Sequence, residues 1–312
     1  MRLGCGAWVY SSPHYQPPYD EAIKIIGDMG FGALELIAFE EADLDEYYTK
    51  ETVKKLRELY ESYGMILSEF AVYTPVVADL AHMEEERREK AFEIFKKAAL
   101  IAKDLGSKAM NLVSNWVQDI KCPMDYPPCY ITPFVNGVGK SSPKLKMQLP
   151  DIDYDVLWDN YMQMMRRCLD FCVENGMDFY IEGHAYVIVG STDAMLRMYD
   201  NIQSPHLGIN FDTAWHLIQR EYLPMSIKKL GKKIKHFHMR DGDGMFSYSL
   251  PCGAGIIDWD GVMQALKDVG FDGVLSFEMG GYADTEDTRK YIQESKEYIE
   301  KAMARVGLTV EK

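Results

Sequence analysis

Four short segments between residues 178 and 281 constrain this chain most, because each ends in a side chain that can bind a metal ion. They read Asp-Phe-Tyr-Ile-Glu182, Leu-Gly-Ile-Asn-Phe-Asp212, Ile-Lys-His-Phe-His238 and Val-Leu-Ser-Phe-Glu278. Apolar and polar residues alternate within each segment, as they do in a strand whose side chains point to opposite faces in turn. The four polar ends therefore share one face. This pattern predicts a barrel whose interior carries the functional polar side chains and whose apolar outer face is covered by helices.

The rest of the chain alternates expected strands with expected helices. Four further strands are expected at 2–10, 32–39, 65–72 and 108–113. The main helices are expected at 51–63, 83–105, 155–175, 259–269 and 284–305. This βαβα order predicts parallel strands with right-handed crossovers. A (β/α)8 barrel takes roughly 250 residues, so we predict a single TIM-barrel domain over residues 1–312, with insertions.

The alternation is interrupted from about 115 to 153. This stretch shows no clear helical pattern and is rich in proline, glycine and aromatic residues. We therefore predict a long loop insertion after strand 4, at the end of the barrel where active sites are built. A surface excursion that packs on itself is one interpretation. A lid, a substrate wall or a partner-docking loop is the other.

The composition excludes several classes of partner. The net charge of −14 opposes binding to phosphate backbones, so no nucleic acid is expected. No run of about 18 apolar residues is present, so no membrane span is expected. The first ten residues read as a strand and lack the apolar core of a signal peptide. The six cysteines form no CxxC pair, which favours free thiols and a cytoplasmic location.

The four strand-end residues Glu182, Asp212, His238 and Glu278 supply three carboxylates and one imidazole. A hard, oxygen-rich ligand set of this kind favours a divalent ion such as Mn²⁺, with Co²⁺ and Mg²⁺ as alternatives, over structural zinc. We therefore predict that these four residues bind one divalent metal ion at the C-terminal mouth of the barrel.

The motifs around these residues resemble the xylose-isomerase-like TIM-barrel superfamily, which includes ketose 3-epimerases and sugar-phosphate isomerases. The segments are Ile-Glu-Gly-His, Asn-Phe-Asp-Thr-Ala-Trp-His, His-Phe-His-Met-Arg-Asp and Ser-Phe-Glu. The resemblance covers the barrel, and its specific part lies in residues 178–281. It implies that the same four residues match the family's metal ligands, and that Glu182 and Glu278 exchange protons with the substrate. The superfamily also has an endonuclease-IV-type branch, which uses additional histidine ligands on early strands. That branch is disfavoured because the expected strands two to four of this chain carry no histidine.

The chemistry of these parts predicts an isomerase or epimerase that acts on a keto-sugar. A divalent cation that bridges a ketone oxygen and the neighbouring hydroxyl acts as a Lewis acid and stabilises an enediolate. Glutamates on the two faces of the sugar would allow a proton to be removed on one side and delivered on the other. If a leaving group lies beta to the carbonyl, the same enolate expels it, and the enzyme is a lyase.

The alternative function is therefore a lyase that cleaves a 3-keto-glycoside. The chain is also similar to the catalytic subunits of C-glycoside deglycosidases, which work with a smaller β subunit. The small-molecule partner would be a sugar or a glycoside, and the protein would form a homo-oligomer or bind a small partner subunit.

Four further residues are candidates for substrate binding. His184 and Arg240 lie two residues beyond Glu182 and His238, so they share the inward face. Alternatively, His184 would support a metal ligand, and Arg240 would form a salt bridge with Asp241 or Asp243. Trp116 would stack on a sugar or anchor the loop. Many family members place a histidine three residues after the aspartate of strand six, where this chain has a tryptophan. The histidine here comes one position later and is the fourth candidate, His216.

Overall fold

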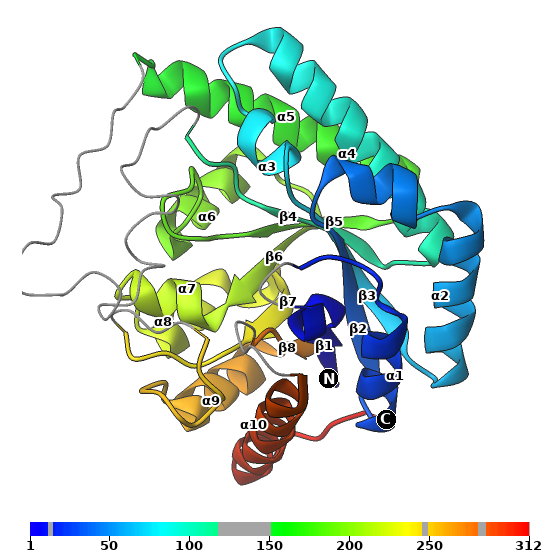
Figure 1. The fold of residues 1–312 in the computed structure, drawn as a ribbon. Helices are drawn as coiled ribbons and strands as arrows, with labels where there is room; N and C mark the ends of the chain where they lie inside the picture. Colours follow the sequence, from blue (N-terminus) through cyan, green and yellow to red (C-terminus); the bar gives the residue numbers. More distant parts are fainter. Residues whose placement is uncertain (12–14, 118–150, 245–248, 280–284, 312) are drawn as a thin grey trace, which may run out of the picture.

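Eight parallel strands close into a barrel in the order of the sequence, and the helices lie around its outside (Figure 1). The computed structural model describes residues 1–11, 15–117, 151–244, 249–279 and 285–311. The strands are β1 (Arg2–Gly6), β2 (Ala33–Ala38), β3 (Ile66–Val72), β4 (Ala109–Val113), β5 (Asp178–Glu182), β6 (Leu207–Asp212), β7 (Ile234–Met239) and β8 (Val274–Phe277). The predicted (β/α)8 TIM barrel is confirmed. The predicted insertion falls mainly on residues 118–150, which lie outside the described residues.

The expected helices are present in the structure, together with several that were not expected. They are α1 (Asp20–Asp28), α2 (Lys50–Ser62), α3 (Val76–Asp79), α4 (Glu85–Leu105), α5 (Tyr154–Glu174), α6 (Thr192–Asn201), α7 (Thr213–Ile218), α8 (Leu223–Leu230), α9 (Trp259–Val269) and α10 (Thr285–Arg305). Short turns of other helix types are η1 (Ala7–Ser11), η2 (Asp43–Tyr47) and η4 (Gly231–Lys233). The prediction for 259–269 matches α9, whereas α3, α7 and α8 were not expected. None of the described helices combines the length and apolar composition that a membrane crossing needs.

The first strand is shorter than the sequence predicted. It was expected to reach residue 10, but it ends at Gly6 and continues as η1. The indole of Trp8 packs directly over Gly6, where a Cβ atom would lie only 2.8 Å from the ring. Glycine therefore allows the chain to turn inward at this point. The turn places the indole N–H of Trp8 against Glu278 at the barrel mouth.

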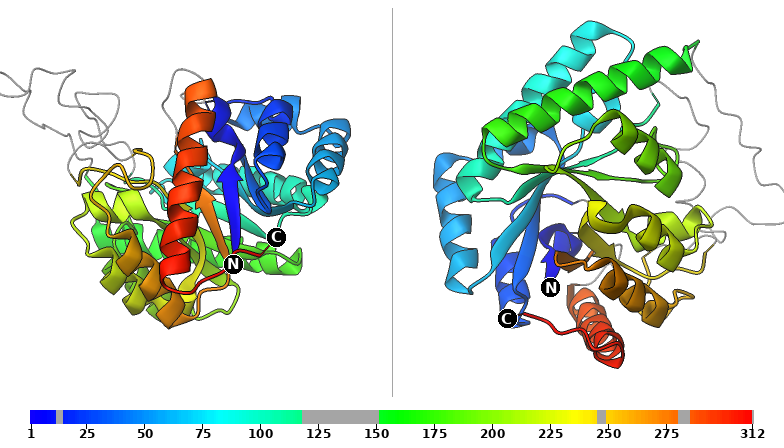
Figure 2. Two further views of the ribbon diagram at one scale, coloured as in Figure 1. Left: turned by 90° about the horizontal axis from the view of Figure 1, so that it is seen from below. Right: turned by 180° about the vertical axis from the view of Figure 1, so that it is seen from behind.

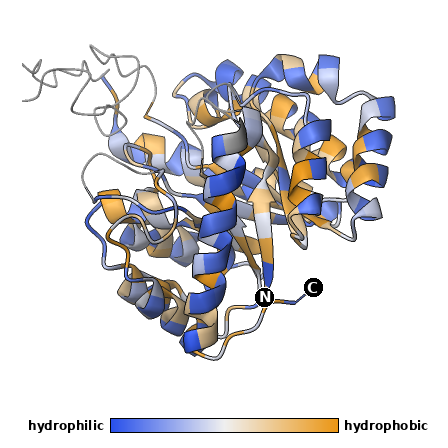
Figure 3. Ribbon diagram, turned by 60° about the horizontal axis from the view of Figure 1, so that its bottom comes forward, coloured by the Kyte–Doolittle hydropathy of each residue, from blue (hydrophilic) through white to orange (hydrophobic). Residues whose placement is uncertain are grey.

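The apolar residues lie between the barrel and its helices, as the alternation predicted. Phe179, Phe211, Phe237 and Phe277 are fully buried on the outward faces of β5 to β8. Figure 3 shows mainly hydrophobic strands, with helices whose outer faces are hydrophilic. Both chain ends lie side by side at the amino-terminal end of the strands (Figure 2), where the N–H of Glu311 donates to the carbonyl of Met1. The opposite end is left free to form the site.

Candidate active site

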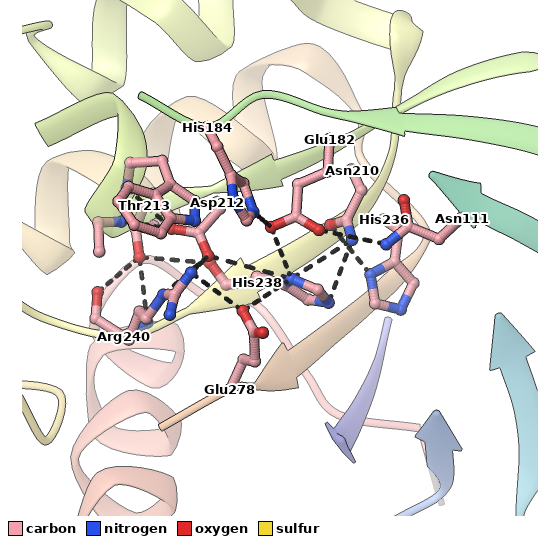
Figure 4. Close-up of polar contacts among 12 residues, drawn as sticks. Asn111, Glu182, His184, Asn210, Asp212, Thr213, His236, His238, Arg240 and Glu278 are labelled. Carbon is pink, nitrogen blue, oxygen red and sulfur yellow. Dashed lines mark hydrogen bonds and ion pairs between the residues drawn. The ribbon is translucent and has the colours of Figure 1, made fainter. Parts of the chain in front are cut away.

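Four side chains from consecutive strands meet at the carboxyl end of the barrel (Figure 4). Glu182 and Asp212 end β5 and β6, His238 is the last but one residue of β7, and Glu278 directly follows β8. One ligand atom from each of the four lies within 4.8 Å of the others. The parallel register sets Asp212 opposite His238, which aligns the ends of the two strands. The residues that the sequence nominated as metal ligands are thus brought together.

Asp212 also caps the next helix. Its Oδ1 accepts hydrogen bonds from the N–H groups of Ala214 and Trp215, at 2.8 and 2.9 Å, and so begins α7. Its Oδ2 accepts from Nε and Nη2 of Arg240, at 2.8 and 2.6 Å, and faces the other three residues. The helix therefore fixes one carboxylate oxygen so that the other points into the site.

Glu182 is held from both sides and is nearly inaccessible. Asn111 donates to Oε2 at 3.2 Å, and His184 Nε2 lies 3.1 Å from Oε1. Burial opposes ionisation of this carboxyl, but His238 and His184 outweigh it and hold the pKa of Glu182 well below its usual value. Glu182 is thus a carboxylate at neutral pH and is able to bind a cation or accept a proton.

Glu278 is the most accessible of the four, with 17% of its side chain exposed. Trp8 Nε1 donates to Oε1 at 3.3 Å, and Nη2 of Arg240 lies 3.2 Å from Oε2. Burial disfavours the charge, but Arg240 and His238 lower the pKa of Glu278 to about 2. This position at the edge of the cavity suits a carboxylate that meets a substrate.

The charges of this cluster fit a divalent cation. Three carboxylates face one guanidinium and the imidazole of His238, whose Nδ1 lies 3.1 Å from Glu278 and 3.5 Å from Glu182. When a cation replaces the second proton of His238, the imidazole is neutral, and two negative charges in a buried place remain to be compensated. A divalent ion would cancel them. The donor set and its spacing are compatible with one bound ion.

A cavity of about 500 Å³ opens above these residues. Its charged half is formed by residues on β5 to β8, including Glu182, His238 and Glu278. Its other half is an aromatic wall made of one ring from the segment after each of β1 to β4, namely Tyr15, Phe39, Tyr73 and Trp116. Neighbouring ring centroids are 5.7, 4.9 and 5.8 Å apart, and the first two contacts are stacked. The mouth of the barrel is thus divided into an ionic half and an apolar half.

Three of the four candidate substrate-binding residues line this cavity: His184, Arg240 and Trp116. His184 pairs with Glu182, and its ring packs on Trp215 with centroids 4.5 Å apart. Arg240 contacts Asp212 and Glu278. Asp241, the first expected partner of Arg240, instead accepts hydrogen bonds from Gly242, Gly253, Ile257 and Trp259.

His216 differs from its expected place. Its ring is fully buried, stacks on Phe211 and brings Nδ1 to 2.8 Å from Oε2 of Glu221. It is not among the described residues that line the cavity, whereas Trp215 is. The reason is the unexpected helix α7, which turns position 215 toward the cavity and position 216 toward the core. The described part of the chain thus places His216 in the core, away from the cavity lining.

Sequence analysis missed the aromatic wall apart from Trp116, and it also missed Trp8. A signal was present, because Phe39 is the last residue of one expected strand and Tyr73 directly follows another. Residues at the carboxyl ends of barrel strands are those that form sites. Tyr15 carries no such signal, since it lies well beyond the end of β1 and of η1.

The comparison with known families agrees with this arrangement. The model of the xylose isomerase-like TIM barrel family matches residues 23–302. The chain belongs to this family. Among curated relatives, the D-psicose 3-epimerase of Enterocloster bolteae is 22% identical over 274 residues, which cover 87% of this chain and 80% of the relative.

Solved structures with low sequence identity share the fold. A D-psicose 3-epimerase from Clostridium cellulolyticum, solved with D-tagatose, has a TM-score of 0.75 at 16% identity and covers 97% of this chain and 99% of its own. The 3-keto-D-glucoside 4-epimerase of E. coli, in its apo form, has a TM-score of 0.70 at 14% identity, covering 96% and 99% of the two chains.

Proposed function

We propose that this protein is a metal-dependent epimerase that moves a proton on the carbon next to the ketone of a sugar. The observation that carries the proposal is the cluster of Glu182, Asp212, His238 and Glu278 on the floor of a cavity large enough for a sugar. The cation, with Mn²⁺ preferred over Co²⁺ and Mg²⁺, would polarise the ketone and acidify the adjacent C–H bond.

The two glutamates divide the proton transfer between them in this proposal. Glu182 comes from β5 and Glu278 from the end of β8, so they approach the cavity from different sides with β6 and β7 between them. Burial opposes ionisation of both, but His238 and His184 lower the pKa of Glu182. Arg240 and His238 lower the pKa of Glu278, so both are carboxylates at neutral pH. One carboxylate would remove the proton from one face of the sugar, and the other, after taking up a proton from solvent, would deliver it to the opposite face.

The names of the relatives support this reaction class. A D-psicose 3-epimerase inverts the carbon beside the ketone of a ketose. A 3-keto-D-glucoside 4-epimerase inverts the carbon beside the ketone of an oxidised glycoside. Both reactions need a proton to leave and return at a carbon alpha to a carbonyl. We assign the same step to this protein without assigning one of those substrates.

Solvent exchange tests the proposed step directly. In D₂O with a panel of ketoses and keto-glycosides, the protein is expected to exchange the proton beside the ketone of its substrate, as followed by ¹H NMR. Dialysis against a chelator should abolish exchange, and Mn²⁺ should restore it, because the ketone then regains its electrophile. Exchange that persists after mass spectrometry shows the metal to be gone would contradict metal dependence.

The aromatic wall favours a second candidate, a lyase that eliminates an aromatic aglycone from a 3-keto-glycoside. A simple ketose offers hydroxyl groups, whereas four contacting rings offer an apolar surface that suits an aromatic substituent. In this reaction a carboxylate removes the proton from C2, the C1–C2 double bond forms, and the bond from C1 to the aglycone breaks. The aglycone leaves with the electron pair and takes a proton, for which His184 lies at the cavity surface.

Replacing Phe39 by Ala distinguishes the two candidates. Phe39 is the ring that stacks on both Tyr15 and Tyr73, and an aromatic contact is worth about 0.5–1.5 kcal/mol. We therefore expect KM for an aryl keto-glycoside to rise about two- to tenfold, with KM for a ketose nearly unchanged. Steady-state kinetics on both substrates, with product analysis by mass spectrometry, measures this. An equal change for both would contradict an aglycone subsite at the wall.

A further inference from the structure

A second set of polar side chains lies deeper in the barrel, below the candidate metal site. Glu35 on β2, Glu69 on β3, Asn210 on β6 and His236 on β7 are each 0–1% exposed. Burying two carboxylates inside a barrel costs free energy unless they are well paired. One oxygen of each, Oε1 of Glu35 and Oε2 of Glu69, has no hydrogen-bond partner among the described residues. A costly arrangement of this kind calls for an explanation beyond packing.

His238 connects this deep set to the candidate metal site through its two ring nitrogens. Nε2 lies 2.8 Å from Oε2 of Glu35, within hydrogen-bond distance. Nδ1, on the other edge of the ring, lies 3.1 Å from Glu278 and 3.5 Å from Glu182. One nitrogen is therefore directed to the barrel interior and the other to the proposed ion.

We infer that Glu35 is a positioning residue for the metal centre, because its carboxylate accepts the Nε2–H of His238 and presents Nδ1 as the ligand atom. This inference rests on the proposed metal-dependent function and names a residue that sets the metal affinity of that same site. A neutral imidazole carries one N–H, and the acceptor that binds it decides which nitrogen stays free for a cation. A carboxylate acceptor also makes the free nitrogen a stronger donor to the metal.

Glu69 is the natural comparison for Glu35. It is equally buried and lies on the next strand, but its Oε1 accepts from Asn210 at 3.0 Å and is 3.5 Å from Nε2 of His238. Of these two similarly buried residues, Glu35 lies closer to Nε2 of His238. The ring of His238 is also held by edge contacts with His236 and Trp8, so its orientation depends on packing as well as on Glu35.

The same deep set has the spacing of a cation site, since ligand atoms of Glu35, Glu69, His236 and His238 lie within 4.8 Å of one another. If one ion occupied this deep set and a second ion occupied the candidate metal site, both ring nitrogens of His238 would be ligands. The ring would then have to lose its last proton. That requirement favours a hydrogen bond over a second ion. The number of ions bound per chain decides between the two.

The test compares Glu35→Leu, Glu35→Gln and the control Glu69→Leu with the wild-type protein. Mn²⁺ affinity is measured by titration with electron paramagnetic resonance, and circular dichroism checks the fold. Glu35→Leu removes the acceptor, and losing such a partner typically weakens metal binding about 10- to 100-fold. Glu35→Gln restores an oxygen acceptor without charge and should recover part of that loss. Glu69→Leu should change the affinity less than about threefold, because it leaves the His238 contact in place.

Each outcome bears on the inference separately from the proposed function. Equal losses in Glu35→Leu and Glu69→Leu, or wild-type affinity in Glu35→Leu, would overturn the role of Glu35 while leaving the metal centre intact. Two ions per wild-type chain, one of them lost in Glu69→Leu, would also overturn it. A wild-type protein that binds no Mn²⁺ would contradict the proposed function and this inference together. If a Leu variant fails to fold, Glu35→Gln and Glu69→Gln are compared instead: weaker Mn²⁺ binding in Glu35→Gln alone, from loss of the acceptor's charge, supports the inference, and equal affinities overturn it.

Discussion

Replacing Glu278 by Gln is expected to lower kcat about 10²–10⁴-fold while the protein still folds and binds its metal ion, because loss of a general base has an effect of this size. Glutamine keeps the volume of the side chain and one oxygen for the cation, but it accepts no proton. Glu278 is the most accessible member of the cluster and lines the cavity. The measurement is kcat on the substrate identified by solvent exchange.

Two controls separate the chemical role of Glu278 from metal binding. Mn²⁺ affinity of the variant should stay within about tenfold of wild type, since three ligands and one oxygen of the fourth are kept. Solvent exchange in D₂O should fall with kcat, because removal of the proton is the step affected. A kcat within a few-fold of wild type would exclude Glu278 as the base. If loss of the metal ion explains the whole fall in kcat, Glu278 serves only as a metal ligand.

The sequence predicted the ionic half of the site because two independent periodicities coincide there. Alternation within each strand set the face of Glu182, Asp212, His238 and Glu278, and the βαβα order set their common end of the barrel. Both patterns are read from neighbouring residues and elements of the sequence, and tertiary packing does not alter them. The strand ends of the structure agree with the predicted ones to within about two residues for β5 to β8, within the usual spread of such boundaries.

The parts that sequence analysis missed depend on tertiary contacts. Trp8 reaches the cavity at a turn where its indole packs over Gly6, and Tyr15 lines the cavity from beyond η1. His216 was misplaced because the capping of α7 by Asp212 reverses which of two neighbouring residues faces the cavity. Glu35 and Glu69 carried a signal that went unused, since a glutamate in the middle of a strand that is otherwise apolar requires a buried polar partner.

Replacing Arg240 by Met is expected to destabilise the metal-free protein by about 3–5 kcal/mol, the usual cost of removing one partner of a buried ion pair. Arg240 is the guanidinium that contacts Asp212 and Glu278, and its side chain is 5% exposed. Methionine fills a similar volume without charge, so both carboxylates would lose the guanidinium that they share. A bound divalent ion compensates the same carboxylates, so the loss should be much smaller in the metal-loaded protein. Denaturant unfolding with and without Mn²⁺ measures the difference.

The matched control is Arg305→Met, which makes the same substitution in a two-pronged pair with Asp260 at the surface. Its two side chains are about half exposed, so solvent screens the pair and little stability should be lost in either metal state. Because Arg240 also repels a cation at the site, its removal should leave Mn²⁺ affinity unchanged or higher. Equal destabilisation of the metal-free and metal-loaded forms of Arg240→Met would show that the guanidinium supports the fold and does not balance the charge of the metal site.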